Sequence, residues 1–413
     1  MIGNFKRFDM QRPPIKQRRY LTLVIWVLSF PMRWYHRTQI KKIGMEGIKP
    51  PYLLISNHNA FLDFIILSTV IFPRRASYVV AIDGYIGREW LLRNVGAICV
   101  RKFTTGTTIV RNMIHSKNQG VITVLYPEAR YSLCGTNAVL PDSVGKLIKK
   151  MNIPVATLIL SGHHVNSPVW ALGNRGVKTS AELKLLYTAE QVQSLSYQEL
   201  NEGLRGALVY DDFRWQKENG IVIKYAKRAE GLEHVLYQCP HCKTEYQMAS
   251  EKNRLFCKQC EKVWEMDEYG ALAATQGETE FTHIPDWYEW EREQVRQQIE
   301  EGTYSLSCQA HVRSLPNARK FQDLGKAQFA HTMDGFHVKG QCGDEPYEEF
   351  WPSKSQYSCH IEYNYLGKFG DCVDLNTLQD TLYIYPEGAD FSVTKISLAT
   401  EELYKKSSAP AKA

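Results

Sequence analysis

Between residues 50 and 165 the chain alternates two kinds of segment. Short runs of five to seven residues are almost wholly apolar, which is typical of strands buried on both faces of a sheet. Longer runs between them mix apolar and polar positions and are predicted to be helices. This alternation predicts an α/β sandwich. Strands are expected at 52–56, 77–82, 96–100, 121–126 and 154–160, and helices at 88–95, 106–119 and 143–151.

The pattern changes beyond this region. A helix pair is expected at 189–208 and a charged, aromatic-rich helix at 284–302. From residue 304 short β-type runs dominate up to a final helix at 399–406, in the outline of a pleckstrin-homology-like barrel. We therefore expect a basic and apolar segment (1–42), an α/β domain (43–236), a cysteine-rich unit (237–265), a helical connector (266–303) and a small C-terminal β-rich domain (304–413).

The formal net charge of +6 is concentrated at the N-terminus. Residues 1–42 hold ten Lys or Arg and one acid, so they carry +9 and the remainder carries −3. The apolar run at 20–30, which Pro31 is expected to end, is shorter than the roughly 20 residues of a spanning helix. Arg33, Trp34 and Tyr35 follow it, and these residues suit a membrane interface rather than a signal-peptide cleavage site. We expect this segment to dock on an anionic lipid surface, with an ordinary buried helix as the alternative.

Four of the ten cysteines form two Cys-x-x-Cys pairs, Cys239 with Cys242 and Cys257 with Cys260. This spacing predicts a small zinc ribbon, in which four thiolates close the coordination shell of a structural Zn²⁺. Redox-active or idle thiols are the alternative. The other six cysteines are scattered and no credible signal peptide precedes them, which indicates a reducing compartment. Together with the basic N-terminus, this predicts a peripheral protein on the cytoplasmic face of a membrane.

His58 and Asp63 lie between two apolar runs in LLISNHNAFLDFIIL, residues 53–67. Residues five apart on a regular helix point about 140° apart, so the pair can meet only if His58 precedes the helix or lies in its first turn. Asn57 is expected to cap that helix. A carboxylate bonded to one imidazole nitrogen leaves the other nitrogen as a general base, whereas a capped helix with a satisfied histidine is the alternative. The remaining histidines, His163 and His164 among them, lack a partner pattern and are expected to be structural.

Charged side chains also follow two other predicted strands. Arg101 and Lys102 end the run VGAICVRKF, and Glu128 and Arg130 follow VITVLY. Cationic side chains at a strand end beside a general base are typical of an anion site.

In this order, the segments resemble the motifs of the glycerolipid acyltransferase family, the enzymes that acylate lysophosphatidic acid and its relatives. The resemblance covers about residues 20–165 and continues more weakly to about 230. The matching residues are Asn57, His58 and Asp63 of Asn-His-x-x-x-x-Asp, Gly96 to Arg101 of a Gly-x-x-x-x-Arg strand end, YPEARYS at 126–132 for Phe-Pro-Glu-Gly-Thr-Arg-Ser, and Ile153, Pro154 and Val155 of a fourth block.

The third block departs from the family pattern. Ala129 stands where the family has Gly, Arg130 comes one position early, and Tyr131 takes the place of the family's Arg. A second similar stretch, YPEGADFS at 385–392, has no following Arg and is expected to be a strand and a turn. This departure affects the expected identity of the acceptor headgroup more than it affects the expected acyl transfer.

The resemblance implies transfer of a fatty acyl group from an acyl thioester to the free hydroxyl of a lysophospholipid, with 1-acyl-sn-glycerol-3-phosphate as the expected acceptor. His58 and Asp63 would be catalytic, while Arg101, Lys102, Glu128 and Arg130 would bind the acceptor. The donor would be acyl-ACP or acyl-CoA, and neither a catalytic cofactor nor a nucleic-acid partner is expected. The alternative is a membrane lipid-binding adaptor without turnover, built on a degenerate acyltransferase fold.

Overall fold

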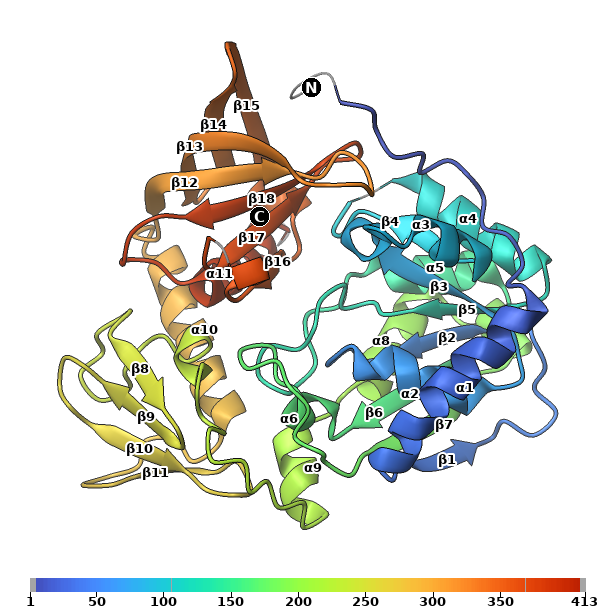
Figure 1. Ribbon diagram of the computed structural model, residues 1–413, viewed down its shortest axis with the longest axis horizontal. Helices are drawn as coiled ribbons and strands as arrows, with labels where there is room; N and C mark the ends of the chain where they lie inside the picture. Colours follow the sequence, from blue (N-terminus) through green and yellow to red (C-terminus); the bar gives the residue numbers. More distant parts are fainter. Residues whose placement is uncertain (1–4, 105, 368, 409–413) are drawn as a thin grey trace.

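The computed structural model describes residues 5–408 apart from 105 and 368, and it contains three β-sheets (Figure 1). The first is a seven-stranded mixed sheet in the order β1-β7-β6-β2-β5-β3-β4. Strands β2 to β6 pair in parallel, whereas β7 runs antiparallel to β6. The predicted α/β architecture is therefore present. Its elements are α1 (Arg19–Tyr35), β1 (Gln39–Ile43), β2 (Leu53–Ser56), α2 (Leu62–Ile71), β3 (Ala76–Ala81), α3 (Glu89–Asn94), β4 (Ile98–Val100), α4 (Thr107–Asn118), β5 (Ile122–Leu125), α5 (Ser143–Met151), β6 (Val155–Ser161), α6 (His163–Asn166), β7 (Ser180–Tyr187), α7 (Ala189–Ser194), α8 (Tyr197–Ala207) and α9 (Asp212–Glu218).

Helices cover both faces of this sheet, as the apolar strands require. Leu54 of β2 packs into a cluster with α2, whereas its neighbours Leu53 and Ile55 pack on the opposite face with α4, α5 and α8. Successive strand side chains point to opposite faces, so a strand covered on both sides is apolar at every position. Helix α1 lies beside α2 on the first face (Figure 1).

The apolar run at the N-terminus forms a longer helix than expected. Helix α1 runs to Tyr35 and contains Pro31, so Pro31 ends the apolar run but not the helix. The Pro31 ring lies on the exposed side of α1, where water can satisfy the carbonyl that loses its partner. No helix among the described residues is both long and apolar enough to cross a bilayer.

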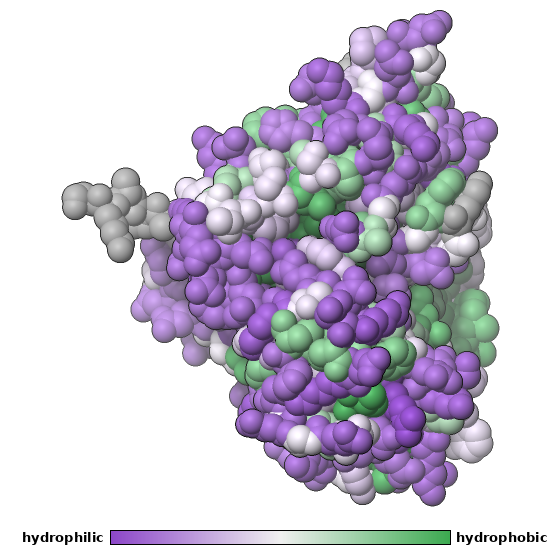
Figure 2. All heavy atoms as spheres, turned by 90° about the vertical axis from the view of Figure 1, so that its left-hand side faces the viewer, coloured by the Kyte–Doolittle hydropathy of each residue, from purple (hydrophilic) through white to green (hydrophobic). Residues whose placement is uncertain are grey.

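Two smaller sheets follow the α/β domain. The cysteine-rich unit is a four-stranded antiparallel sheet, and α10 (Ile284–Glu300) leads from it to a seven-stranded antiparallel sheet that ends in α11 (Val393–Ser408). The final helix begins six residues earlier than the sequence predicted. Seen from the side of these two units, the surface is mostly hydrophilic, with hydrophobic residues in small patches (Figure 2). Their strands are β8 (Met248–Glu251), β9 (Arg254–Cys257), β10 (Val263–Met266) and β11 (Leu272–Ala274), then β12 (Leu306–Ser314), β13 (Gln322–Thr332), β14 (Gly335–Cys342), β15 (Glu345–Pro352), β16 (His360–Glu362), β17 (Cys372–Asn376) and β18 (Thr381–Pro386).

One hydrophobic cluster joins the three units. It includes Leu133 from the loop after β5, Val165 of α6, Trp264 of β10, Trp287 of α10 and Leu398 of α11. The C-terminal domain is therefore packed against the segments that follow β5 and β6. These are the same segments that carry the motif residues.

Candidate active site

His58 and Asp63 meet at the carboxyl end of β2. His58 lies in the loop before α2, and its Nδ1 is 2.9 Å from Oδ2 of Asp63 in the first turn of that helix. The Asp63 side chain is fully buried, whereas 22% of the His58 side chain is exposed. Because Asp63 only accepts, His58 carries its proton on Nδ1, and Nε2 is left as a hydrogen-bond acceptor.

Asp63 also fixes the loop that carries His58. Its Oδ2 accepts hydrogen bonds from the backbone N–H groups of Asn59 at 2.5 Å and Ala60 at 3.0 Å. The predicted cap, Asn57, does something else: its amide exchanges two hydrogen bonds of 2.9 Å with the backbone of Leu160. The capping prediction was wrong because Asn57 extends the pairing of β2 with β6 by one residue.

His163 is a functional neighbour that the sequence interpretation missed. Its Nδ1 lies 2.6 Å from Oδ1 of Asp63, and both side chains are completely buried. His163 follows β6, the parallel neighbour of β2, so both carboxyl ends reach the same edge of the sheet. That shared edge was the available signal, but it requires the strand order, which one sequence does not give.

The two histidines control the ionisation of Asp63. Burial would raise its pKa, but the hydrogen bonds from His163 and His58 outweigh this effect and hold the pKa well below its ordinary value. Asp63 therefore stays negatively charged next to His58.

Two tyrosines of the third motif enclose the His58 ring. Tyr126 stacks on it with ring centroids 4.1 Å apart, and Tyr131 lies at 4.4 Å in a tilted arrangement. Between them, Ala129 adopts a left-handed φ of +55°, the conformation for which the family's Gly is suited. The unusual third motif thus keeps its turn and places an aromatic ring beside the imidazole.

Glu128 is buried close to the same loop. Burial raises the pKa of its carboxyl to about 8, and the Arg130 charge only partly opposes this rise. Neither carboxyl oxygen has a partner of ordinary hydrogen-bond geometry within the described residues. Such a group is neutral near pH 7 and can donate as well as accept a hydrogen bond.

The structure does not bring Arg101 and Lys102 to an open anion site. The Arg101 guanidinium, which is 4% exposed, donates to the carbonyls of Leu315 and Pro316 and to the Thr381 hydroxyl. Lys102 lies 3.6 Å from a carboxyl oxygen of Asp374 and 3.9 Å from one of Asp83. The expectation of free cations here needs correction, because the C-terminal domain covers the end of β4.

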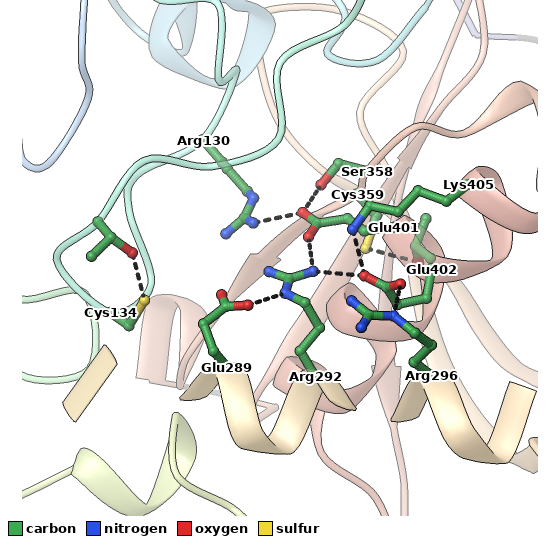
Figure 3. A network of polar contacts seen from close by, with 12 residues as sticks. Arg130, Cys134, Glu289, Arg292, Arg296, Ser358, Cys359, Glu401, Glu402 and Lys405 are labelled. Carbon is green, nitrogen blue, oxygen red and sulfur yellow. Dashed lines mark hydrogen bonds and ion pairs between the residues drawn. The ribbon is translucent and has the colours of Figure 1, made fainter. Parts of the chain in front are cut away.

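Arg130 is also engaged by the C-terminal domain (Figure 3). Its Nη2 lies 2.7 Å from Glu401 of α11, whose other carboxyl oxygen lies 2.6 Å from Arg292 of α10. Ser358 donates a third hydrogen bond to Glu401. Although burial opposes it, the charges of Arg292 and Arg130 lower the pKa of Glu401 to about 2. Glu401 therefore connects the Arg130 loop, α10 and Ser358. The predicted contact of Arg130 with a substrate phosphate stays a prediction.

The four predicted metal ligands lie together. The sulfur atoms of Cys239, Cys242, Cys257 and Cys260 are all within 4.8 Å of one another, and two of the pairs are 3.7 Å apart. A tetrahedron with Zn–S bonds of about 2.3 Å requires sulfur atoms about 3.8 Å apart. The donor set and its spacing therefore fit a tetrathiolate zinc site.

Comparison with known proteins bears on the α/β domain. The Acyltransferase family model matches residues 35–161. Among solved structures, the chain is similar to the 1-acyl-sn-glycerophosphate (LPA) acyltransferase PlsC from Thermotoga maritima, with 15% identity and a TM-score of 0.36 over 46% of this chain and 77% of that one. A comparison with curated proteins finds no match. Residues 35–161 hold the His58–Asp63 pair and all four motifs, and the chain contains an acyltransferase-family domain, as those motifs predicted.

Proposed function

We propose that this protein transfers a fatty acyl group from an acyl thioester to the free hydroxyl of a lysophospholipid. The observation that carries the proposal is the partly exposed imidazole of His58, held by the buried carboxylate of Asp63 in an acyltransferase-family domain. The assembled pair favours turnover over a lipid-binding adaptor, which would not need an ordered general base.

The chemistry needs one base and no covalent acyl-enzyme. Nε2 of His58 accepts the proton of the acceptor hydroxyl. At the same time the hydroxyl oxygen attacks the carbonyl carbon of the thioester and forms a C–O bond. The tetrahedral intermediate then expels the thiolate, which takes the proton back from His58. Asp63 stabilises the imidazolium that exists between these steps.

The acceptor we propose to test first is 1-acyl-sn-glycerol-3-phosphate. The Glu128 carboxyl is neutral near pH 7 and has no hydrogen-bond partner of ordinary geometry among the described residues, so it is suited to orient a glycerol hydroxyl beside His58. In the described conformation Arg101, Lys102 and Arg130 are engaged by protein groups, so binding of an acceptor phosphate by them requires exchange of those partners. The activity test should therefore compare lysophospholipid acceptors that carry a phosphomonoester with acceptors that do not.

The test is acyl transfer from radiolabelled acyl-CoA and acyl-ACP to lysophosphatidic acid and to a panel of other lysophospholipids. His58→Ala should lower kcat by about 100- to 10,000-fold, the usual worth of a general base. His115→Ala, on the exposed end of α4, is the matched control and should keep full activity. Failure of the wild-type protein to exceed His58→Ala with every donor and acceptor would refute the proposal.

We further propose that α1 docks the protein on a membrane surface. One side of this helix exposes large apolar residues at helical spacing, and Leu28 and Trp34 are 72% and 77% exposed. Phe61, in the loop just after His58, is 65% exposed. A solvent-exposed apolar stripe with aromatic residues at its end suits the interfacial region of a bilayer. The exposed large apolar residues of α1 are Tyr20, Leu23, Val24, Val27, Leu28, Phe30, Trp34 and Tyr35.

A cationic hollow beside the end of α1 supports an anionic surface as the partner. It has a volume of about 920 Å³ and is lined by Arg33, Arg37 and Lys178 together with aromatic residues of α1. None of these three cations forms an ion pair in the described part of the chain. Burial and the nearby charges of Arg74 and Arg33 also lower the pKa of Lys42, which indicates a positive field there. Anionic headgroups complement such a surface.

Sedimentation with vesicles of neutral or mixed neutral and anionic phospholipid tests this docking. Leu28→Glu should weaken binding at least about tenfold, since a buried Leu contributes about 2 kcal/mol. Lys178→Glu should weaken binding only to anionic vesicles and most strongly at low salt. Leu378→Glu is the matched control, because Leu378 is 64% exposed in the C-terminal domain. Equal loss in Leu28→Glu and Leu378→Glu would contradict the proposal.

We also propose that the four cysteines hold a structural Zn²⁺. Four sulfur ligands leave no open position on the metal, so the ion would brace the unit that connects the α/β domain to α10.

A further inference from the structure

We propose that His163 is a positioning residue that keeps the Asp63 carboxylate directed at the general base, so that Asp63 is shared by two histidines rather than serving one. The inference rests on the proposed function and deepens it. Its basis is geometric: Asp63 uses Oδ2 for His58 and Oδ1 for His163, at 2.9 Å and 2.6 Å.

The contact constrains the one rotation that Asp63 has left. The torsion about the Cβ–Cγ bond is intrinsically broad and roughly two-fold, and turning it would carry Oδ2 away from His58 and from the N–H groups of Asn59 and Ala60. With Oδ1 bonded to a side chain on another strand end, the carboxylate plane is fixed. Since the direction of Oδ2 sets the tautomer and the orientation of His58, the constraint passes to the imidazole.

His163 itself is anchored well enough to do this. It is completely buried in the first turn of α6. Asp212 of α9 holds that turn, because its two carboxyl oxygens accept hydrogen bonds from the backbone N–H groups of Gly162 and His164, each at 2.8 Å. The segments that follow β2 and β6 thus meet at the Asp63 carboxylate, and α9 holds the second segment in place.

Among the described residues, the hydrogen bond to Asp63 is the one hydrogen bond of the His163 ring. Its Nε2 is buried without a hydrogen-bond partner in the described residues. The titratable groups close to the ring are Asp63, Asp212 and His36, and Asp63 is the one it contacts. An imidazole kept in the core for packing alone would be better replaced by an apolar side chain, since a buried polar atom without a partner is costly. This points to the Nδ1 donor as the reason for a histidine here.

The test compares two substitutions of the same branched shape. His163→Asn keeps an N–H donor at the position of Nδ1, whereas His163→Leu removes it. We expect His163→Leu to lower kcat for acyl transfer about 10- to 100-fold with KM within about twofold, by analogy with the loss of hydrogen bonds that orient metal-binding histidines. His163→Asn should stay within about threefold of the wild-type kcat.

A double substitution separates positioning from general damage. If His163 acts only through Asp63, then Asp63→Asn and the double variant Asp63→Asn with His163→Leu should have the same kcat within about twofold. Val192→Ala, on the opposite face of the sheet, is the control for loss of packing and should leave kcat unchanged. A further drop in the double variant, or an equal drop in His163→Asn and His163→Leu, would overturn the proposal.

A readout independent of turnover distinguishes this inference from the proposed function. In protein labelled with ¹⁵N-histidine, the shifts of His58 report which ring nitrogen carries the proton. The Nδ1–H form should predominate in the wild type and in His163→Asn and should give way to a mixture in His163→Leu. His163→Phe, which fills the ring volume without a donor, repeats the measurement. Unchanged His58 shifts in both apolar variants would refute the link, whether or not any lysophospholipid is acylated.

Discussion

Replacing Glu401 by Gln removes the negative charge at the centre of the junction between α11, α10 and the third motif. The Glu401 side chain is fully buried and bonds to Arg130, Arg292 and Ser358 (Figure 3). A carboxyl whose pKa is about 2 instead of 4.5 favours the folded state by about 3 kcal/mol. Breaking a buried ion pair by removing one partner typically costs about 3–5 kcal/mol. We therefore expect Glu401→Gln to lower the free energy of unfolding by about 3 kcal/mol at pH 7.

The two partners of this charge should respond differently. In Glu401→Gln, Arg130 loses its one ion-pair partner among the described residues, where its Nε and Nη1 also have no hydrogen-bond partner. In Arg130→Met, Glu401 keeps Arg292 and Ser358. We expect the loss to be smaller in Arg130→Met than in Glu401→Gln, and the double variant to be more stable than the sum of the two losses predicts.

Urea unfolding followed by tryptophan fluorescence measures these differences. Because the folded pKa of Glu401 lies below the ordinary value, its contribution is complete above about pH 4.5 and disappears as the pH falls toward 2. The gap between wild type and Glu401→Gln should therefore begin to narrow near pH 4.5 and close near pH 2. Two results together would refute this reasoning: Glu401→Gln is as stable as wild type at pH 7, and Arg130→Met loses activity without losing stability. Arg130 would then bind a ligand rather than stabilise the junction.

Three further predictions concern the motif loop and the cysteine unit. Ala129→Gly should raise the free energy of unfolding by about 0.5 kcal/mol, because a Cβ is disfavoured at φ +55°; a lower melting temperature would contradict this. The raised pKa of Glu128 means that the folded state retains its proton between about pH 4.5 and 8, so wild-type stability should fall with rising pH across that window. Glu128→Gln should lack this fall in urea titrations, and a parallel pH dependence of both proteins would refute the assignment. Metal analysis should find one zinc per chain, lost in Cys257→Ser and after chelation, with increased proteolysis between residues 237 and 265; a metal-free protein that resists proteolysis there would count against the site.

The sequence anticipated those features that depend on neighbours along the chain. Five apolar runs became β2 to β6 because a strand covered on both faces must be apolar at each position. The His58–Asp63 contact followed from a spacing of five residues at a strand-to-helix junction. The clustering of the four cysteines likewise followed from short spacings, since each Cys-x-x-Cys pair spans four residues and fourteen residues separate the two pairs.

Tertiary structure decided the contacts between segments that are far apart in sequence. His163 lies 100 residues beyond Asp63 and reaches it only because β6 pairs with β2. The partners of Arg101 and Arg130 come from a domain more than 200 residues away, so the sequence alone suggested open cations where the folded chain has buried ones. Periodicity and spacing report local geometry, whereas the order of strands and the docking of domains depend on how complementary surfaces bury one another, and that is determined only when the whole chain folds.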